Sequence, residues 1–154
     1  MKILKTTAIC VLLSLCMHSQ AQVHQVQMHE PDYSKPKMYK NLPDRLQFKV
    51  QEFDGLFTTE LGKEVNLPIS KNFSFSGTVV SKSDDVDPKI KSIVIRSSEN
   101  NGATLTISRV INVDNTISYK GRIMSFKHGD AYELTYENGT YYLSKKASHN
   151  LYNE

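Results

Sequence analysis

The sequence predicts a mainly β fold: an antiparallel meander of about six strands, preceded by one amphipathic helix. Apolar residues recur at intervals of three and four between Asn41 and Leu61, and they alternate with polar residues from Phe73 onwards. Short turns separate the later apolar runs, so the strands that they join are expected to be antiparallel neighbours. A curled open sheet and a small barrel both satisfy this pattern.

The expected helix begins at Asn41, which can serve as the N-cap, with Pro43 in the first turn. Gly55 is expected to end or break the helix, and Gly62 marks the next stop. A helix of this length is marginal alone, so its apolar stripe should pack against the sheet. The stripe consists of Leu42, Leu46, Val50, Phe53, Leu56, Phe57 and Leu61.

The strands are expected where apolar runs are separated by turn residues. They are residues 73–80, 89–96, 103–113, 116–126, 131–137 and 140–145. Asn138–Gly139 is the strongest hairpin signal in the chain, and a two-residue turn there pairs Tyr136 with Tyr141 and Leu134 with Leu143.

Two further turns extend this register, because a slip of one residue would move every side chain to the other face. A two-residue turn at His128–Gly129 pairs Ile123 with Leu134. A three-residue loop at 114–116 pairs Ile111 with Tyr119 and Ile107 with Ile123. The resulting apolar face contains Leu105, Ile107, Ile111, Ile117, Tyr119, Ile123, Tyr132, Leu134, Tyr136, Tyr141 and Leu143. The solvent-facing side contains Thr104, Thr106, Ser108, Ser118, Lys120, Arg122, Glu133, Thr135 and Ser144.

The first 21 residues have the layout of a secretory signal peptide. Lys2 and Lys5 precede a short apolar run, and Ser19 and Ala21 are the small residues expected before a cleavage site. The signal predicts a secreted or periplasmic protein. The alternative is a lipoprotein anchored through Cys16, although the residue before that cysteine is not the small one that lipidation favours.

The composition excludes several classes of protein. The chain has 19 Lys or Arg and 16 Asp or Glu, and Lys2 and Lys5 lie in the predicted signal peptide. The mature chain is therefore close to neutral, which argues against nucleic acid as the main partner. No later apolar run approaches the roughly 20 residues that span a bilayer, so no transmembrane segment is expected. Both cysteines, Cys10 and Cys16, precede the cleavage site, so the mature chain is predicted to be cysteine-free.

Domain boundaries follow from these patterns. Residues 22–40 are expected to form a flexible arm, residues 41–146 the folded domain and residues 147–154 a C-terminal tail. His24 and His29 in the arm are interpreted as solvated residues, because their spacing suits neither one helical face nor one strand face.

The sequence contains no phosphate-binding glycine loop and no hydrolase or metalloprotease motif. A hydrolase that uses His128 and Asp130 is the least favoured function, because the register places His128 at an exposed hairpin tip. Asp84, Asp85 and Asp87 are interpreted as a solvated acidic loop. No cofactor and no metal site are predicted, and the protein is more readily explained as a non-enzyme.

Arg109 is the one charged residue on the predicted apolar face, where Gly121 is expected opposite it. Glu60 or Glu64 could supply its partner. A structural arginine that pairs internally explains the pattern. The functional alternative is an anion-recognising arginine in a sheet-lined cavity, which would make the protein a small-ligand carrier.

A mixed patch on the polar face suggests another function. Lys120 and Arg122 alternate with the apolar Met124 and Phe126, and Tyr142 is the one tyrosine of the last two hairpins that faces outward. Apolar groups beside cations suit a protein partner. The sequence therefore predicts a secreted, non-catalytic binding or interaction module. Its candidate binding residues are Arg109, Lys120, Arg122, Phe126 and Tyr142.

Overall fold

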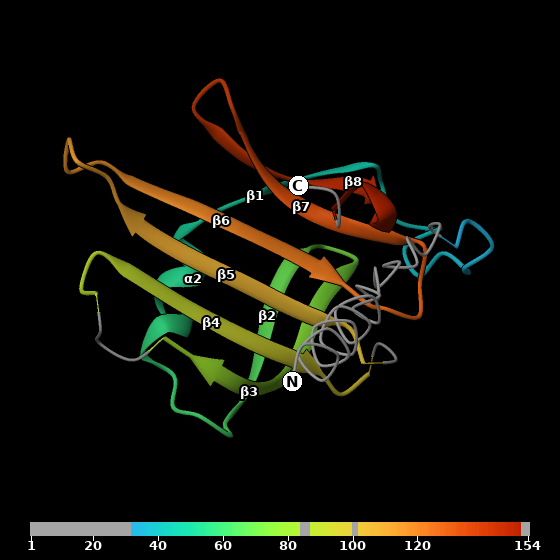
Figure 1. Ribbon diagram of the computed structural model, residues 1–154, viewed down its shortest axis with the longest axis horizontal. Helices are drawn as coiled ribbons and strands as arrows, with labels where there is room; N and C mark the ends of the chain where they lie inside the picture. Colours follow the sequence, from blue (N-terminus) through green and yellow to red (C-terminus); the bar gives the residue numbers. More distant parts are fainter. Residues whose placement is uncertain (1–31, 84–86, 100–101, 152–154) are drawn as a thin grey trace, which may run out of the picture. The chain divides into compact units, whose positions relative to one another are not determined.

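Alternating polar and apolar side chains place most of the chain in one antiparallel sheet. The computed structural model describes residues 32–83, 87–99 and 102–151, all of which lie in the unit formed by Pro31–Glu154. Within these residues the sheet has eight strands in the order β1-β8-β7-β6-β5-β4-β3-β2 (Figure 1). The sheet curls into a half-barrel.

The strands vary from four to ten residues in length. Their bounds are β1 Arg45–Phe48, β2 Glu64–Ser70, β3 Phe73–Lys82, β4 Ile90–Ser97, β5 Thr104–Ile111, β6 Ile117–Met124, β7 Asp130–Glu137 and β8 Thr140–Ala147. The helical elements are short: α2 is Gln51–Asp54, and the 3-10 turns are η2, Leu56–Thr58, and η3, Ser148–Leu151.

The predicted mainly β class is confirmed, but the strand count is larger than expected. The six predicted strands correspond to β3 through β8, whereas β1 and β2 were not predicted. In β2, Val65, Leu67 and Ile69 alternate with polar residues or proline. Pro68 is tolerated because β2 is the outermost strand and its free side needs no backbone donor.

The expected helix from Asn41 to Leu61 is wrong. The range instead contains β1, α2 and η2. Leu46 and Phe48 are buried by strand alternation, whereas Phe53 and Leu56 are buried from the short helices. Most residues of the predicted stripe therefore pack in or against the core, from a strand and from short helices, but Leu61 is 65% exposed. Pairing of β1 with the edge of β8 outweighs the local preference for helix.

The Asn138–Gly139 hairpin is confirmed. Tyr136 pairs with Tyr141 and Leu134 pairs with Leu143. Asn138 and Gly139 both have positive φ, 50° and 80°, as a type I′ turn requires.

The other two predicted registers are wrong by two residues. Ile111 pairs with Ile117 in place of Tyr119, and Ile123 pairs with Tyr132 in place of Leu134. A shift of two leaves each side chain on its predicted face, because the side-chain period of a strand is also two. Both loops are longer than expected, and the centre of each lies one residue earlier in the chain, which produces the shift of two.

Hydrogen bonds within these loops explain their length. In the β5–β6 loop, the Thr116 amide donates to Asp114 Oδ1 at 3.0 Å, and Asn115 takes a positive φ of 62°. In the β6–β7 loop, the His128 amide donates to the Ser125 carbonyl at 3.1 Å. Such local bonds satisfy backbone groups that a tighter turn would have paired in the ladder.

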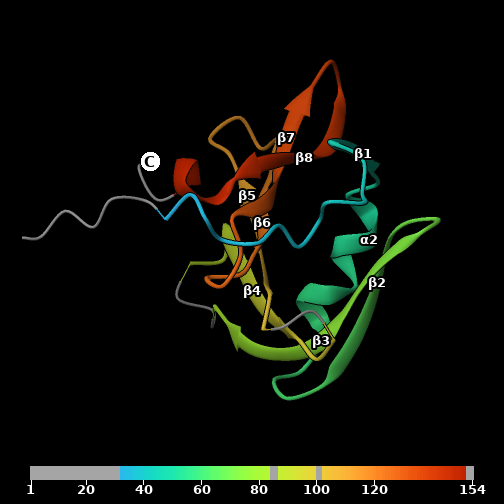
Figure 2. The same ribbon diagram turned by 90° about the vertical axis from the view of Figure 1, so that its right-hand side faces the viewer.

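The core lies on the inner face of the half-barrel, which α2 and η2 cover (Figure 2). Phe53 of α2 stacks on Phe48 of β1 with ring centroids 4.3 Å apart. Complete burial of each such large side chain contributes roughly 1.5–3 kcal/mol. Within the predicted apolar face, six residues are buried: Leu105, Ile107, Ile123, Tyr132, Leu134 and Leu143.

The described part of the predicted arm, residues 32–40, is held against the start of β7. The backbone N–H groups of Met38 and Tyr39 donate to the two carboxylate oxygens of Asp130, at 2.6 and 2.9 Å. The Gly129 N–H donates to the Pro36 carbonyl at 3.0 Å. A Cβ at Gly129 would lie 2.9 Å from the Lys35 carbonyl oxygen, so glycine permits this close approach.

No helix in the described part of the chain has the length and apolar character needed to cross a bilayer. The predicted signal peptide 1–21, His24 and His29 lie outside the described residues. The same holds for Asp84 and Asp85, whereas the Asp87 carboxylate accepts the backbone N–H of Lys89 at 2.8 Å.

Candidate functional site

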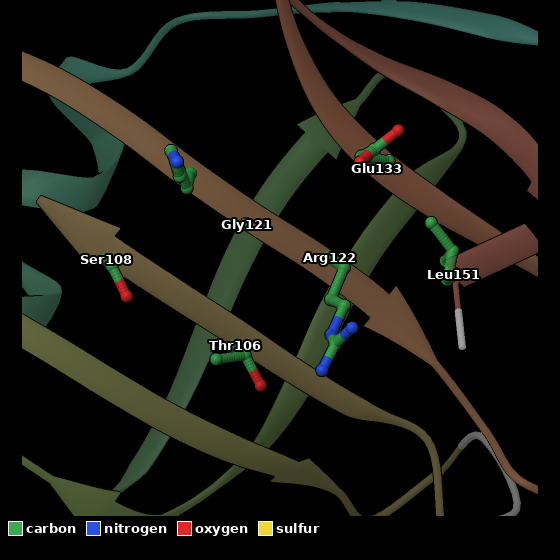
Figure 3. Close-up of a pocket in the computed structure, with 7 residues that line it drawn as sticks. Thr106, Ser108, Gly121, Arg122, Glu133 and Leu151 are labelled. Atoms are coloured by element: carbon green, nitrogen blue, oxygen red, sulfur yellow. The ribbon is translucent and has the colours of Figure 1, made fainter. Parts of the chain in front are cut away.

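A pocket of about 320 Å³ lies on the polar side of β5, β6 and β7, the face away from the core (Figure 3). Strand alternation puts hydroxyls from β5 and cations from β6 on this side, and η3 closes one end with an apolar side chain. The lining residues are Thr106, Ser108, Lys120, Gly121, Arg122, Glu133 and Leu151.

Lys120 and Arg122 are the two cations of this pocket, and both are exposed. In the part of the chain that the structure describes, neither forms an ion pair. Glu133 is the one carboxylate that lines the pocket, and its Oε2 lies 3.9 Å from Lys146 Nζ. The pocket therefore holds two cations without an ion pair and one carboxylate, and this excess of positive charge favours an anionic group.

The lining side chains leave the pocket open on the polar side of β5. Figure 3 shows the guanidinium of Arg122 directed toward Thr106, while the carboxylate of Glu133 points away. Arg122 and Thr106 are direct cross-strand partners, as are Lys120 and Ser108. The Ser108 hydroxyl lies 2.7 Å from the Ser92 hydroxyl on β4 and forms a hydrogen bond with it. An anion here would meet one guanidinium, one ammonium and neighbouring hydroxyls.

The predicted binding residues on the polar face are only partly together. Lys120 and Arg122 share the pocket, and Phe126 is 74% exposed in the loop that follows β6. Tyr142 faces the same side from β8, where the Arg45 guanidinium lies 3.9 Å from its ring centroid. Met124 was expected in this patch, but it is buried with Ala131 and Leu151 because η3 covers it.

Arg109 lies on the opposite face of the sheet from this pocket. Its partners across the ladder are Lys91 and Tyr119, so the expected position opposite Gly121 is wrong. The Tyr119 hydroxyl donates to Asp54 Oδ1 at 2.8 Å. Burial and the bond to Asp54 raise the pKa of Tyr119, whereas Arg109 favours the ionised form of this hydroxyl and so acts to lower its pKa.

His128 and Asp130 have separate partners. The His128 Nδ1 lies 3.1 Å from the Ser125 hydroxyl. Both Asp130 oxygens accept backbone N–H groups of residues 38 and 39. A hydrolase would need the carboxylate to orient the imidazole, and Asp130 is committed elsewhere.

Several pocket residues were not singled out from the sequence. Thr106, Ser108 and Glu133 were placed on the polar face, but the alternation carried no signal that they would line a hollow. Leu151 lay in the predicted tail, and nothing local indicated that η3 folds back onto β6 and β7. No group of three metal-ligating side chains occurs among the residues that the structure describes.

Comparison with known proteins identifies no matching family model, no similar curated protein and no similar solved structure. Folds of this class serve unrelated functions, so function has to be inferred from the site.

Proposed function

We propose that the protein is a non-catalytic binding module that engages a partner protein through the polar face of its sheet. The observation that carries this proposal is the pocket in which Lys120 and Arg122 lie without an ion pair among the described residues. A partner can contact these cations without first breaking an internal ion pair, which would cost part of the binding free energy.

Neighbouring residues add aromatic rings and a further cation to this surface. Phe126 is 74% exposed next to the end of β6, and Tyr142 and Arg45 stack on the same face. Arginine and large aromatic residues are enriched among the residues that dominate interface energetics. The combination of cations and rings therefore suits a partner that offers carboxylates beside apolar side chains.

The binding proposal predicts that a double variant, Lys120→Glu with Phe126→Ser, loses partner binding but remains folded. Partner recovery from the compartment where the protein resides should fall about tenfold, because a positive and an apolar contact are both removed. Quantitative mass spectrometry after affinity capture measures the recovery, and circular dichroism checks that the variant is folded.

The matched control is Lys71→Glu with Tyr33→Ser. It makes the same charge change in the β2–β3 turn and removes an aromatic ring with the same 74% exposure. Recovery should stay at the wild-type level in this control. Equal recovery by the wild type and the Lys120/Phe126 variant would contradict a role for the polar face.

We also propose that the module acts after export, since the N-terminal 21 residues are typical of a cleaved signal. The mass of the mature chain should then correspond to a start at Gln22. A chain that begins at Cys16 and carries lipid would instead support the anchored alternative.

A further inference from the structure

β6 and β7 are paired over a much shorter length than the other long strands. Their ladder contains Arg122↔Glu133 and two further pairs, and it ends there. By contrast, β5 and β6 are paired from Ile111↔Ile117 along the whole length of both strands. The β5–β6 and β7–β8 hairpins diverge toward their turns (Figures 1 and 2). The divergence follows the end of the ladder, N-terminal to Arg122 in β6 and C-terminal to Glu133 in β7. Among the described strands, residues 117–121 of β6 therefore pair on one side only, with β5.

Backbone groups of this free edge point away from β5. The Asn112 N–H donates to the Thr116 carbonyl across the β5–β6 ladder. In an antiparallel ladder the direction of these groups alternates, so Ile117 and Tyr119 direct their N–H and C=O groups to the other side. The Tyr119 N–H meets the Tyr141 hydroxyl oxygen at 3.1 Å. A side chain thus occupies a position that a strand would otherwise fill.

The inner side of the opening is apolar and exposed. Ile117 of β6 is 46% exposed and Tyr136 of β7 is 62% exposed, although both belong to the face that forms the core elsewhere. The Tyr141 ring lies 5.8 Å from the Tyr119 ring and 4.7 Å from the Tyr136 ring, measured between centroids. Apolar side chains of an added strand would cover these groups.

The outer side of the same opening is basic. Lys120 lies between Tyr119 and Gly121 on the free segment, and Arg122 lies where pairing with β7 begins. Both line the pocket described above. Acidic side chains of an added strand would face them, and opposite charges across a ladder favour pairing.

We propose that an extended partner segment, in which acidic and apolar residues alternate, adds as a strand along residues 117–121 of β6. Main-chain bonds to Ile117, and to Tyr119 once the segment displaces the Tyr141 hydroxyl, would supply affinity, while the two faces of the segment would supply selectivity. This inference rests on the proposed binding function, and it adds the mode of binding and the chemical pattern of the partner.

The test uses a short synthetic peptide of alternating glutamate and valine with blocked ends. We expect saturable binding by titration calorimetry, together with slower hydrogen exchange at the amides of Ile117 and Tyr119. A peptide of the same composition with all glutamates grouped at one end should bind about tenfold more weakly. Equal affinity for the alternating and the grouped peptide would overturn the proposed pattern.

Two N-methylated isomers of the alternating peptide separate strand addition from simple charge attraction. One isomer is methylated at the valine amides and the other at the glutamate amides, so charge and side chains are identical. Only one set of amides faces β6 in a strand. One isomer should therefore lose at least about tenfold in affinity while the other retains it. Equal affinity of the two isomers would overturn strand addition but leave the proposed binding function intact.

Variants of the chain complete the test. Ile117→Pro removes a donor on the free edge without removing one that faces β5, so it should abolish peptide binding while Ile117→Val retains it. Lys120→Gln with Arg122→Gln should weaken binding about tenfold, whereas Lys91→Gln, on the other face, should not. Self-association through this edge, detected by sedimentation at rising concentration and abolished by Ile117→Pro, would favour a second copy of the chain and overturn the partner proposal.

Discussion

The two halves of β7 have different environments although they belong to one strand with one alternating pattern. Tyr132 and Tyr136 are the same residue type on the same face, yet Tyr132 is fully buried and Tyr136 is 62% exposed. Near Tyr132, β7 has β6 on one side and β8 on the other. Near Tyr136, β8 is the one strand of the described residues that pairs with β7.

The difference shows that alternation assigns a side chain to a face but does not assign its burial. The first half of β7 is also covered by the segment that Asp130 holds through the backbone of Met38 and Tyr39. The Tyr132 hydroxyl donates to the Pro43 carbonyl, which extends the same anchorage. The second half lacks these contacts, and we propose that its exposed side chains serve binding.

The largest expected effect is on the free energy of unfolding when the buried ring is removed. Tyr132→Ala should destabilise the protein by about 3–5 kcal/mol, because a fully buried ring leaves a cavity. Tyr136→Ala should change the free energy of unfolding by less than about 0.5 kcal/mol. Urea unfolding followed by circular dichroism measures both values, and similar losses in the two variants would contradict the distinction between the halves.

A second effect isolates the contact that anchors the first half. Asp130→Asn replaces one acceptor oxygen with an amide that faces a backbone N–H, and it should cost about 1–3 kcal/mol. Hydrogen exchange at Met38 and Tyr39 should become faster than in the wild type. Asp87→Asn is the control, because the backbone N–H of Lys89 that the Asp87 carboxylate accepts is exposed. An unchanged exchange rate at Met38 and Tyr39 in Asp130→Asn would show that other contacts hold this segment.

The third effect is confined to alkaline solution. Burial, followed by the negative charges of Asp44 and Asp130, raises the pKa of Tyr132 from 10.0 to about 12. Burial and Asp130 also raise the pKa of Tyr39. The unfolded chain therefore loses these protons first, so the free energy of unfolding should fall as the pH rises from 10 to 12.

Tyr132→Phe removes one of these titrating groups, so its free energy of unfolding should fall less steeply over the same interval. Urea unfolding at several pH values measures both slopes. The variant also lacks the hydrogen bond to the Pro43 carbonyl. That loss lowers the free energy of unfolding by a constant amount, so comparing the two slopes removes it. Identical slopes in the variant and the wild type would mean that Tyr132 does not titrate differently in the folded state.

The prediction of the fold succeeded where a local pattern was sufficient. The Asn138–Gly139 hairpin is confirmed because its conformation depends on two residues that accept positive φ. The errors at 112–116 and 125–129 involve loops whose lengths depend on side-chain bonds such as that from Thr116 to Asp114. Those bonds do not appear in an apolar pattern.

The candidate site was predictable only in part. Alternation placed Lys120 and Arg122 on the polar face, and they do line one pocket. The burial of Met124 and the presence of Leu151 in that pocket depend on η3, which is distant from β6 in the sequence. Arg109 was recognised as unusual, but its position opposite Tyr119 depends on the true β5–β6 register.

The sequence alone determined the mainly β class, the Asn138–Gly139 turn and the face to which each side chain of β5 to β8 belongs. These properties follow from the period of two and from local backbone preferences, which neighbouring strands do not alter. The tertiary structure decided the pairing of β1 with β8, the early end of the β6–β7 ladder and therefore which apolar side chains stay exposed. Such properties depend on contacts between residues far apart in the chain, where packing and edge pairing outweigh local propensity.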